Sequence, residues 1–304
     1  MTMSPVAGSL VVAVDGSDHA DRAVVWAAEQ AALEGRRLVV MHCLGGWRGV
    51  PEWMALWNAD GDTLPEVVDS AGRDIVEAAA QLAKRTSPQI EVNPIVVDLD
   101  PRDALIEAST QAHTIVVGTH GRSIWGRVAL GSVSSATSQH ASCPVVIIGH
   151  PPVDAPRAGV LVGAEGTAES IPVIEFAFRF ASQRALPLTV VHCYWDIVGE
   201  MAQGRHVATT EEGVSELRLV LSESVAGLAE KFPDVHVDLQ LARGLVDVVL
   251  TEDEPARDLI VVGRSQRSLW ARLLDGSVAA AVLDRAHGHV AVVPETQPLA
   301  ATER

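Results

Sequence analysis

The sequence is short of aromatic residues and of positive charge, and each shortage excludes a class of protein. Aromatic residues make up 4% of the 304 residues, so the cores must be built from Val, Leu, Ile and Ala. Lys and Arg total 23 against 39 Asp and Glu, and this formal charge of −16 argues against nucleic acid or an anionic membrane as a partner. Any phosphate site must therefore be made locally, from backbone N–H groups and a few arginines.

Cysteines and long apolar runs are also scarce, and this bears on the compartment. Cys43, Cys143 and Cys193 fall inside apolar segments without C-x-x-C spacing, which predicts buried thiols rather than disulfides or a zinc site. The N-terminal residues MTMSPVAGSLVVAV lack the basic region of a signal peptide. No apolar run reaches the roughly 18 residues that a membrane-spanning helix needs. The sequence therefore predicts a soluble cytoplasmic protein.

The stretch IVVGTHGRSIWGRVALGSVS, residues 115–134, has the features of a phosphate-binding loop. A short apolar strand runs into Gly118, where the chain can turn sharply. Gly121 removes a Cβ where a backbone N–H would approach an oxyanion, and Gly131 and Ser132 begin a predicted helix whose N-terminal N–H groups attract anions. The stretch also supplies two arginines, Arg122 and Arg127. On spacing alone, a glycine-rich loop without a ligand explains the pattern equally well.

The chain repeats itself. LVVAVDGS at 10–17 matches VLVGAEGT at 160–167, and RSIWGRVALGSV at 122–133 matches RSLWARLLDGSV at 267–278. The offset falls from 150 to 145, which indicates a five-residue deletion between the two matches. A proline-rich join, PPVDAPRAG, separates the copies. The repeat predicts two domains, 1–150 and 156–295.

In each copy, apolar strands alternate with amphipathic helices, which predicts a parallel sheet covered by helices on both faces. In the first copy we expect strands at 10–14, around 40, at 91–97, at 115–117 and after Cys143, helices at 20–33, 71–84, 102–111 and after Ser132, and an irregular segment at 45–70. Ligands of such sheets bind beyond the carboxyl ends of the strands. Asp15 and Gly118 are both predicted to lie at such ends.

The spacing G-x-x-G-x9-G-S, which starts at Gly118, resembles the nucleotide-binding signature of the ATP-binding branch of the universal stress protein family. Asp15 matches the family's first-strand aspartate, and the resemblance covers nearly the whole chain. It implies an α/β protein with two tandem doubly wound, Rossmann-like (adenine nucleotide alpha hydrolase-like) domains of five strands each, in the order 3-2-1-4-5. It also implies ATP as the ligand, with Mg²⁺ carried by the phosphates rather than by dedicated protein ligands.

The resemblance places Asp15 at the adenosine and the backbone of Met41 beside the base. Around the phosphates the resemblance places Gly118, His120, Gly121, Gly131, Ser132, Val133 and Ser134. We add Arg127, one of the two loop arginines, to these candidates. Asp15 also has a purely structural interpretation, because Asp-Gly-Ser is common turn chemistry. His42 and His192 recur before a cysteine and are interpreted as core histidines rather than metal ligands. A tryptophan cluster at 47, 53 and 57 either covers the adenine or forms an interface.

The second copy departs from the signature at four positions, with Glu165 for Asp15, Gln266 for Gly121, Asp275 for Leu130 and Ala279 for Ser134. A carboxylate beside a phosphate, at about 4 Å and an effective dielectric near 20, repels it by a few kcal/mol. We therefore expect the first domain to bind ATP and the second to bind it poorly or not at all.

The sequence contains no recognisable catalytic set, because Walker A, nucleophile-elbow and HExxH patterns are all missing. The expected function is that of an ATP-binding stress-response regulator, with at most weak ATP hydrolysis, that signals through its conformation or through an unidentified protein partner. The last strand of each copy is apolar, and because the resemblance implies that such strands pair domains or subunits, we expect the two domains to associate and a homodimer to be possible. Two alternatives stay open: an adenine-nucleotide-dependent enzyme, which includes a slow ATPase, and a nucleotide-free interaction protein.

Overall fold

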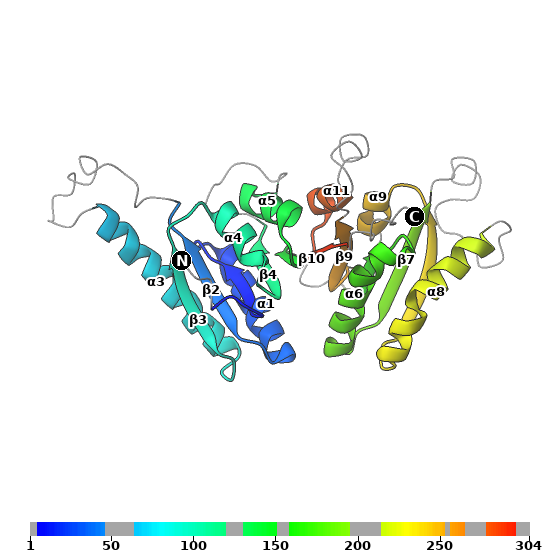
Figure 1. Ribbon diagram of the computed structural model, residues 1–304, viewed down its shortest axis with the longest axis horizontal. Helices are drawn as coiled ribbons and strands as arrows, with labels where there is room; N and C mark the ends of the chain where they lie inside the picture. Colours follow the sequence, from blue (N-terminus) through cyan, green and yellow to red (C-terminus); the bar gives the residue numbers. More distant parts are fainter. Residues whose placement is uncertain are drawn as a thin grey trace, which may run out of the picture. The chain divides into compact units, whose positions relative to one another are not determined.

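Two units of the same architecture make up the chain, Met1–Ile148 and Gly149–Arg304 (Figure 1). The computed structural model describes residues 5–45, 64–119, 130–150, 158–194, 214–252, 256–264 and 278–295. Within these ranges, no helix is both long and apolar enough to cross a membrane.

The first unit alternates strands and helices along the chain (Figure 1). Its elements are β1 (Leu10–Ala13), α1 (Asp18–Glu34), β2 (Leu38–Cys43), α3 (Leu64–Thr86), β3 (Val92–Val97), α4 (Pro101–Ser109), β4 (Thr114–Gly118), α5 (Ser132–His140) and β5 (Val145–Ile148). The strands lie in the order β3-β2-β1-β4-β5, and each neighbouring pair is parallel. Helix α1 packs against α3, and α4 packs against α5. Right-handed crossovers in opposite directions from β1 place these two pairs on opposite faces of the sheet.

The second unit repeats this plan. Its elements are β6 (Val160–Gly163), the 3₁₀ turn η2 (Ala168–Ser170), α6 (Ile171–Arg184), β7 (Leu188–Tyr194), α8 (Ser215–Lys231), β8 (Val237–Arg243), α9 (Val246–Glu252), β9 (Leu259–Arg264), α11 (Val278–Arg285) and β10 (Val290–Pro294). The strand order is β8-β7-β6-β9-β10, and every pair is again parallel. The prediction of five strands per domain in the order 3-2-1-4-5 is confirmed.

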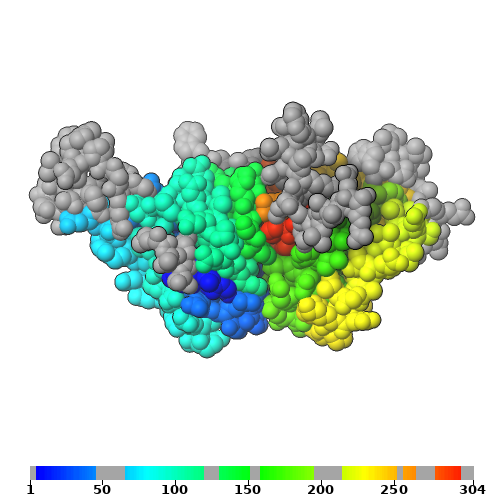
Figure 2. Space-filling model, in the orientation of Figure 1, coloured from blue at the N-terminus to red at the C-terminus, as the bar shows by residue number. Residues whose placement is uncertain are grey.

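Aliphatic side chains form the core of both units. The first three residues of β1 are fully buried, as are Val160 and Val162 of β6, because a parallel sheet with helices on both faces hides its central strands from water. Aromatic packing is local: the rings of Phe178 and Phe232 stack with their centroids 5.9 Å apart. On the outer surface, α8 (yellow in Figure 2) exposes Leu219 to 57%.

Helix α3 begins earlier than the sequence pattern indicated. We expected an irregular segment through residue 70, but α3 already starts at Leu64. Pro65 fits the first turn because that turn has no intrahelical acceptor for its N–H group, and Glu66 favours the positive end of the helix dipole. The predicted tryptophan cluster lies outside the described residues.

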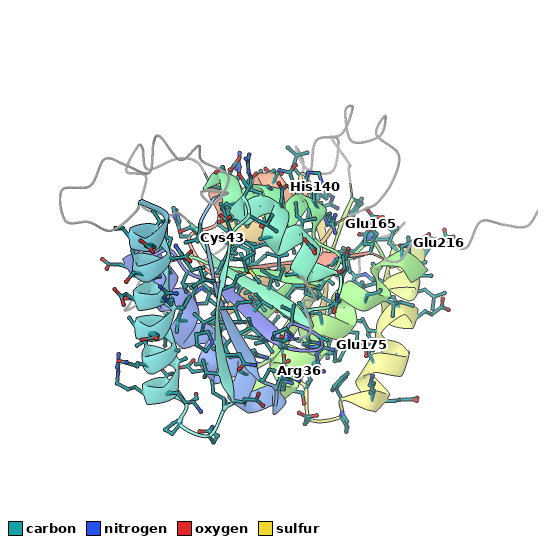
Figure 3. All side chains as sticks on the ribbon, turned by 60° about the vertical axis from the view of Figure 1, so that its left-hand side comes forward. Arg36, Cys43, His140, Glu165, Glu175 and Glu216 are labelled. Carbon is teal, nitrogen blue, oxygen red and sulfur yellow. The ribbon has the colours of Figure 1, made fainter. Side chains whose placement is uncertain are left out.

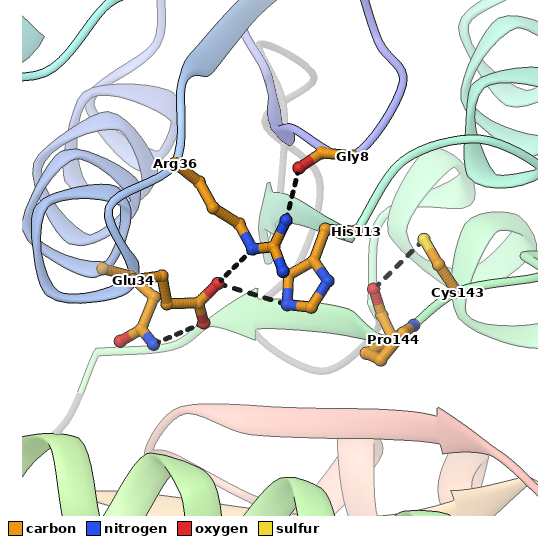
Figure 4. Close-up of polar contacts among 7 residues, drawn as sticks. Gly8, Glu34, Arg36, His113, Cys143 and Pro144 are labelled. Carbon is orange, nitrogen blue, oxygen red and sulfur yellow. Dashed lines mark hydrogen bonds and ion pairs between the residues drawn. The ribbon is translucent and has the colours of Figure 1, made fainter.

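A cluster of polar side chains ties together the amino-terminal edge of the first unit's sheet (Figure 4). The carboxylate of Glu34, at the end of α1, accepts from Gln30 Nε2 at 2.8 Å and lies 3.3 Å from Arg36 Nε and 3.2 Å from His113 Nε2. Arg36 also donates to the backbone oxygen of Gly8 at 2.8 Å. These contacts join the end of α1 to the segments that lead into β1, β2 and β4. The polar side chains of this amino edge therefore make structural contacts, and a ligand is expected at the opposite, carboxyl edge.

Candidate functional site

The turn after β1 fixes a carboxylate at the carboxyl edge of the first unit. Asp15 Oδ1 accepts from the backbone N–H of Ser17 at 3.1 Å and from the Ser17 hydroxyl at 2.6 Å. Ser17 Oγ in turn accepts from Ala20 N at 3.3 Å and caps α1. Gly16 completes the turn with φ = 76°. Asp15 thus has the turn role that its neighbours suggested, and it remains only half-buried.

The end of β2 is joined to the end of β1. The backbone oxygen of Met41 accepts from Val14 N at 2.9 Å, and the Met41 side chain is fully buried. His42 Nδ1 lies 2.7 Å from the backbone oxygen of Val14, and because that oxygen can only accept, the ring nitrogen donates. In the second unit, His192 makes the same bond to Ala164 at 3.0 Å. Both histidines are half-buried and use Nδ1 for a bond to the neighbouring strand, which supports their interpretation as structural residues rather than metal ligands.

The end of β4 meets both α1 and α5. A Cβ at Gly118 would lie 3.0 Å from the backbone oxygen of His19, a contact so tight that the backbone of α1 would have to shift, so glycine favours this close approach of β4 to α1. The buried Ser134 donates its hydroxyl to the Gly118 carbonyl at 2.6 Å. Gly131 N donates to the backbone oxygen of Thr119 at 2.9 Å, which brings together the two described ends of the glycine loop.

The start of α5 is suited to bind an anion. Its N-cap residue is Gly131, which has no side chain with which to cap the helix. The N–H groups of the first turn are therefore not occupied by their own cap residue, and the helix dipole adds a partial positive charge there. Ser132 is exposed and Val133 is half-buried, so this first turn reaches the surface. An anion could bind to these N–H groups.

The structure thus places Asp15, Met41, Gly118 and the first turn of α5 at strand ends and helix starts of one sheet edge. Three further predicted site residues, His120, Gly121 and Arg127, lie outside the described residues. Figure 3 shows Cys43 at this end of the first unit and Arg36 at the other.

The second unit differs at the same edge. Glu165 is exposed, whereas Asp15 is half-buried. Thr167 occupies the N-cap position without a side-chain capping bond, and a 3₁₀ turn precedes α6. Ala279 is buried at the position of Ser134 but has no hydroxyl group to donate. A Cβ at Gly263, the counterpart of Gly118, would clash with Glu295 Oε1, so a carboxylate lies against this strand end. Gln266 and Asp275 lie outside the described residues.

The thiols at the ends of β2 and β7 are not nucleophiles. Burial raises the pKa of Cys43 to about 12, with a smaller contribution from the charge of Asp100, and burial raises the pKa of Cys193 to about 12. Because the thiolate is the reactive form, these half-buried cysteines are inert near neutral pH. All three cysteines are free thiols, and Cys143 is buried.

A family model described as the Universal stress protein family matches residues 8–149 and 158–294. The chain belongs to the universal stress protein family. The universal stress protein Rv2005c of Mycobacterium tuberculosis is 32% identical over 297 residues, which cover 94% of this chain and 95% of that protein.

Solved structures of the family share the fold. A universal stress protein from Archaeoglobus fulgidus superposes with a TM-score of 0.65 at 17% identity, covering 95% of this chain and 97% of its own. A shorter universal stress protein from Archaeoglobus fulgidus, solved in complex with dAMP, is 25% identical over 47% of this chain and 98% of its own, with a TM-score of 0.34.

Sequence reasoning missed one residue at this edge. His19, in the first turn of α1, has its Nδ1 atom 3.2 Å from the hydroxyl of Thr119, which is 100 positions further along the chain. The motif itself could not reveal this contact, because His19 lies outside it. The only signal was the position of His19 two residues after Ser17, which places it in the first turn of a helix that begins at the same sheet edge.

Proposed function

We propose that the first unit binds ATP at the carboxyl edge of its sheet and that nucleotide occupancy, rather than catalysis, is its function. The observation that carries the proposal is the packing of α1 and α5 against Gly118, at the end of β4. This strand end is held by Ser134 of α5 and lies against the first turn of α1, which begins three residues after Asp15. A carboxylate and an uncapped helix start therefore flank one sheet edge, and they match the hydroxyl and the phosphate groups of a nucleotide, respectively.

In this proposal Asp15 accepts from the ribose or the base amino group, and the backbone at Met41 flanks the base. The phosphates lie against the loop and the start of α5, a set that comprises Gly118, His120, Gly121, Arg127, Gly131, Ser132, Val133 and Ser134. In the described part of the chain, no group of three or more His, Cys, Asp or Glu side chains could hold a metal ion. Mg²⁺ would accordingly be bound through the phosphates.

We propose further that the second unit binds ATP weakly or not at all. Glu165 alters the adenosine end, the Glu295 carboxylate at Gly263 acts against a bound phosphate, and Ala279 lacks the hydroxyl that ties α5 to the strand end in the first unit. ATP bound in the first unit would then change the surface that a protein partner recognises, with at most weak hydrolysis. The cytoplasm, which supplies ATP and keeps thiols reduced, is the compartment that this proposal requires.

The first experiment is to denature freshly purified protein and identify any released nucleotide by chromatography and mass spectrometry, followed by calorimetric titration with ATP and Mg²⁺. We expect about one ATP per chain. Two per chain would contradict the proposal for the second unit. No nucleotide and no titration signal would instead favour a nucleotide-free interaction protein, and rapid phosphate release would favour an enzyme.

The repeat supplies matched controls for these titrations. Asp15→Asn keeps an acceptor for Ser17 but removes the charge, and it should weaken ATP binding roughly tenfold, the equivalent of about 1.4 kcal/mol. The same change in the other unit, Glu165→Gln, should leave ATP binding unaltered. Equal effects of the two variants would contradict the assignment of the site to the first unit.

Association of the two units with each other and formation of a homodimer are also proposed, from the apolar character of β5 and β10. Light scattering during size-exclusion chromatography, with and without ATP, tests the homodimer. A monomer at every protein concentration would rule it out.

A further inference from the structure

His19 brings one ring nitrogen to two partners. Its Nδ1 atom lies 2.9 Å from Arg22 Nη2, one turn further along α1, and 3.2 Å from Thr119 Oγ1, directly after β4. The imidazole therefore lies between the first turn of α1 and the first described residue of the glycine loop.

The chemistry of Arg22 fixes the role of that nitrogen. A guanidinium group has only donors, so Nδ1 must accept from Arg22, and the ring proton must lie on Nε2. Since Nδ1 then carries no proton, the hydroxyl of Thr119 must donate to it, and it shares the single lone pair of Nδ1 with Arg22 in a three-centre hydrogen bond. Arg22 thus selects the tautomer of His19, and the tautomer orients the hydroxyl of Thr119.

The same short segment holds both described ends of the glycine loop. The Thr119 backbone oxygen accepts from Gly131 N at 2.9 Å, and Gly131 is the N-cap of α5. The backbone oxygen of His19 lies against Gly118, whose carbonyl accepts from Ser134. A displacement of Thr119 would therefore be transmitted to the start of α5, where the first-turn N–H groups lie.

We infer that His19 is a positioning residue for the nucleotide site of the first unit: as a hydrogen-bond acceptor it fixes Thr119 and, through Thr119, the N-terminus of α5. This inference rests on the proposed ATP binding. It extends that proposal, because it makes the first turn of α1 one of the elements that determine the affinity for the nucleotide. The second unit has Glu169 at the position of His19 and Arg264 at that of Thr119, so a pair of neutral groups is replaced by a pair of opposite charges.

The test compares two replacements of His19 in the full-length protein by ATP titration. His19→Leu keeps bulk but removes the acceptor, and it should raise the dissociation constant for ATP roughly tenfold, the effect of losing one well-placed hydrogen bond. His19→Asn offers an amide oxygen near the position of Nδ1 and should restore most of the affinity. A purely space-filling role predicts the reverse order, and that result would overturn the inference.

A double-mutant cycle with Thr119→Val, which keeps the shape of threonine without its hydroxyl, tests the contact itself. If His19 acts through Thr119, the loss in the double variant should be smaller than the product of the two single losses. Strictly multiplicative losses would contradict the coupling. Glu169→Leu is the matched control in the second unit and should not change ATP binding.

Two readouts do not depend on nucleotide. Long-range ¹H–¹⁵N spectra of the ¹⁵N-histidine-labelled apoprotein at pH 8 should show a His19 ring protonated at Nε2. Hydrogen exchange at the Gly131 amide should be faster in His19→Leu than in the wild type. If the wild type binds no ATP, the proposed function fails, and the exchange rate at Gly131 alone decides the role of His19: an unchanged rate refutes it.

Discussion

The cluster around Glu34 allows a quantitative prediction about the stability of the first unit. The Glu34 side chain is 7% exposed, and its carboxylate meets the side chains of Arg36 and His113, which are 38% and 21% exposed. In Glu34→Gln the shape and one acceptor are kept, but the new NH₂ group turns a donor toward groups that also donate. The contacts of Glu34 with Arg36 and His113 are ion pairs; removing one charge of a buried pair costs about 3–5 kcal/mol, and the partial exposure of both partners reduces this cost. We expect a loss of about 2 kcal/mol in the free energy of unfolding.

The assay is native-state hydrogen exchange of the β1 and β2 amides as a function of urea, because it reports the free energy of opening of the first unit separately. Peptides from β6 and β7 serve as an internal reference and should not change. Glu29→Gln is the matched control, since it makes the same chemical change at an exposed position of the same helix and should alter stability by no more than about 0.5 kcal/mol. If the two variants were indistinguishable, the contacts of Glu34 would contribute no net stability and the reasoning would be refuted.

Three further predictions concern two glycine positions and the shifted pKa values of Cys43 and Asp100. In Gly227→Ala, in α8, the new Cβ meets no atom within 4 Å, so the variant should raise the free energy of unfolding of the second unit by about 0.5–1 kcal/mol. In Gly72→Ala the new Cβ would lie 2.8 Å from Leu44 Cδ2, so a urea titration should show a smaller increase in stability. The pKa of Cys43, raised from 9.0 to about 12, should make its alkylation by iodoacetamide at pH 8 about a thousandfold slower in folded than in urea-unfolded protein, and comparable rates would contradict this. The side-chain and backbone hydrogen bonds from Arg102 lower the pKa of Asp100 from 3.8 to about 2, so the stabilisation of α4 by Asp100 is complete above pH 3.8 and is lost as the pH falls through 2. Asp100→Asn should abolish this part of the pH dependence of amide hydrogen exchange in α4.

The sequence predicted the architecture well because its signals were local and repeated. The helix expected at 20–33 is α1: Ser17, which follows the Asp-Gly turn, is its N-cap, and Gly35 ends it in the left-handed conformation. The missed start of α3 has a simple cause. Pro65 was interpreted as part of an irregular segment, but in the first turn of a helix a proline costs no hydrogen bond.

The contacts that build the candidate site could not be predicted in the same way. Asp15 and Gly118 were identified from a motif, but a motif states only the order of residues. The bond from Ser134 to Gly118 spans 16 positions and the contact between His19 and Thr119 spans 100, so both depend on how α1 and α5 pack against the end of β4. Such contacts follow from the tertiary structure, and no periodicity in the sequence carries them.

Comparison of the two units separates the scaffold from the site. The histidine bond at the end of the second strand occurs in both units, through His42 and His192, which marks it as part of the scaffold. At the amino edge, Asp258 occupies the position that His113 has in the first unit. Its carboxylate makes a different structural contact, because it accepts a hydrogen bond from Gly159 N at 3.1 Å.

At the carboxyl edge, the described residues of the second unit also differ from those of the first. Ala279 cannot donate the bond that Ser134 makes, and the carboxylate of Glu295 lies against Gly263, the counterpart of Gly118. These two differences support the proposal that the second unit binds ATP weakly or not at all, because one removes a bond that holds the start of α5 and the other adds a negative charge near the expected position of the phosphates.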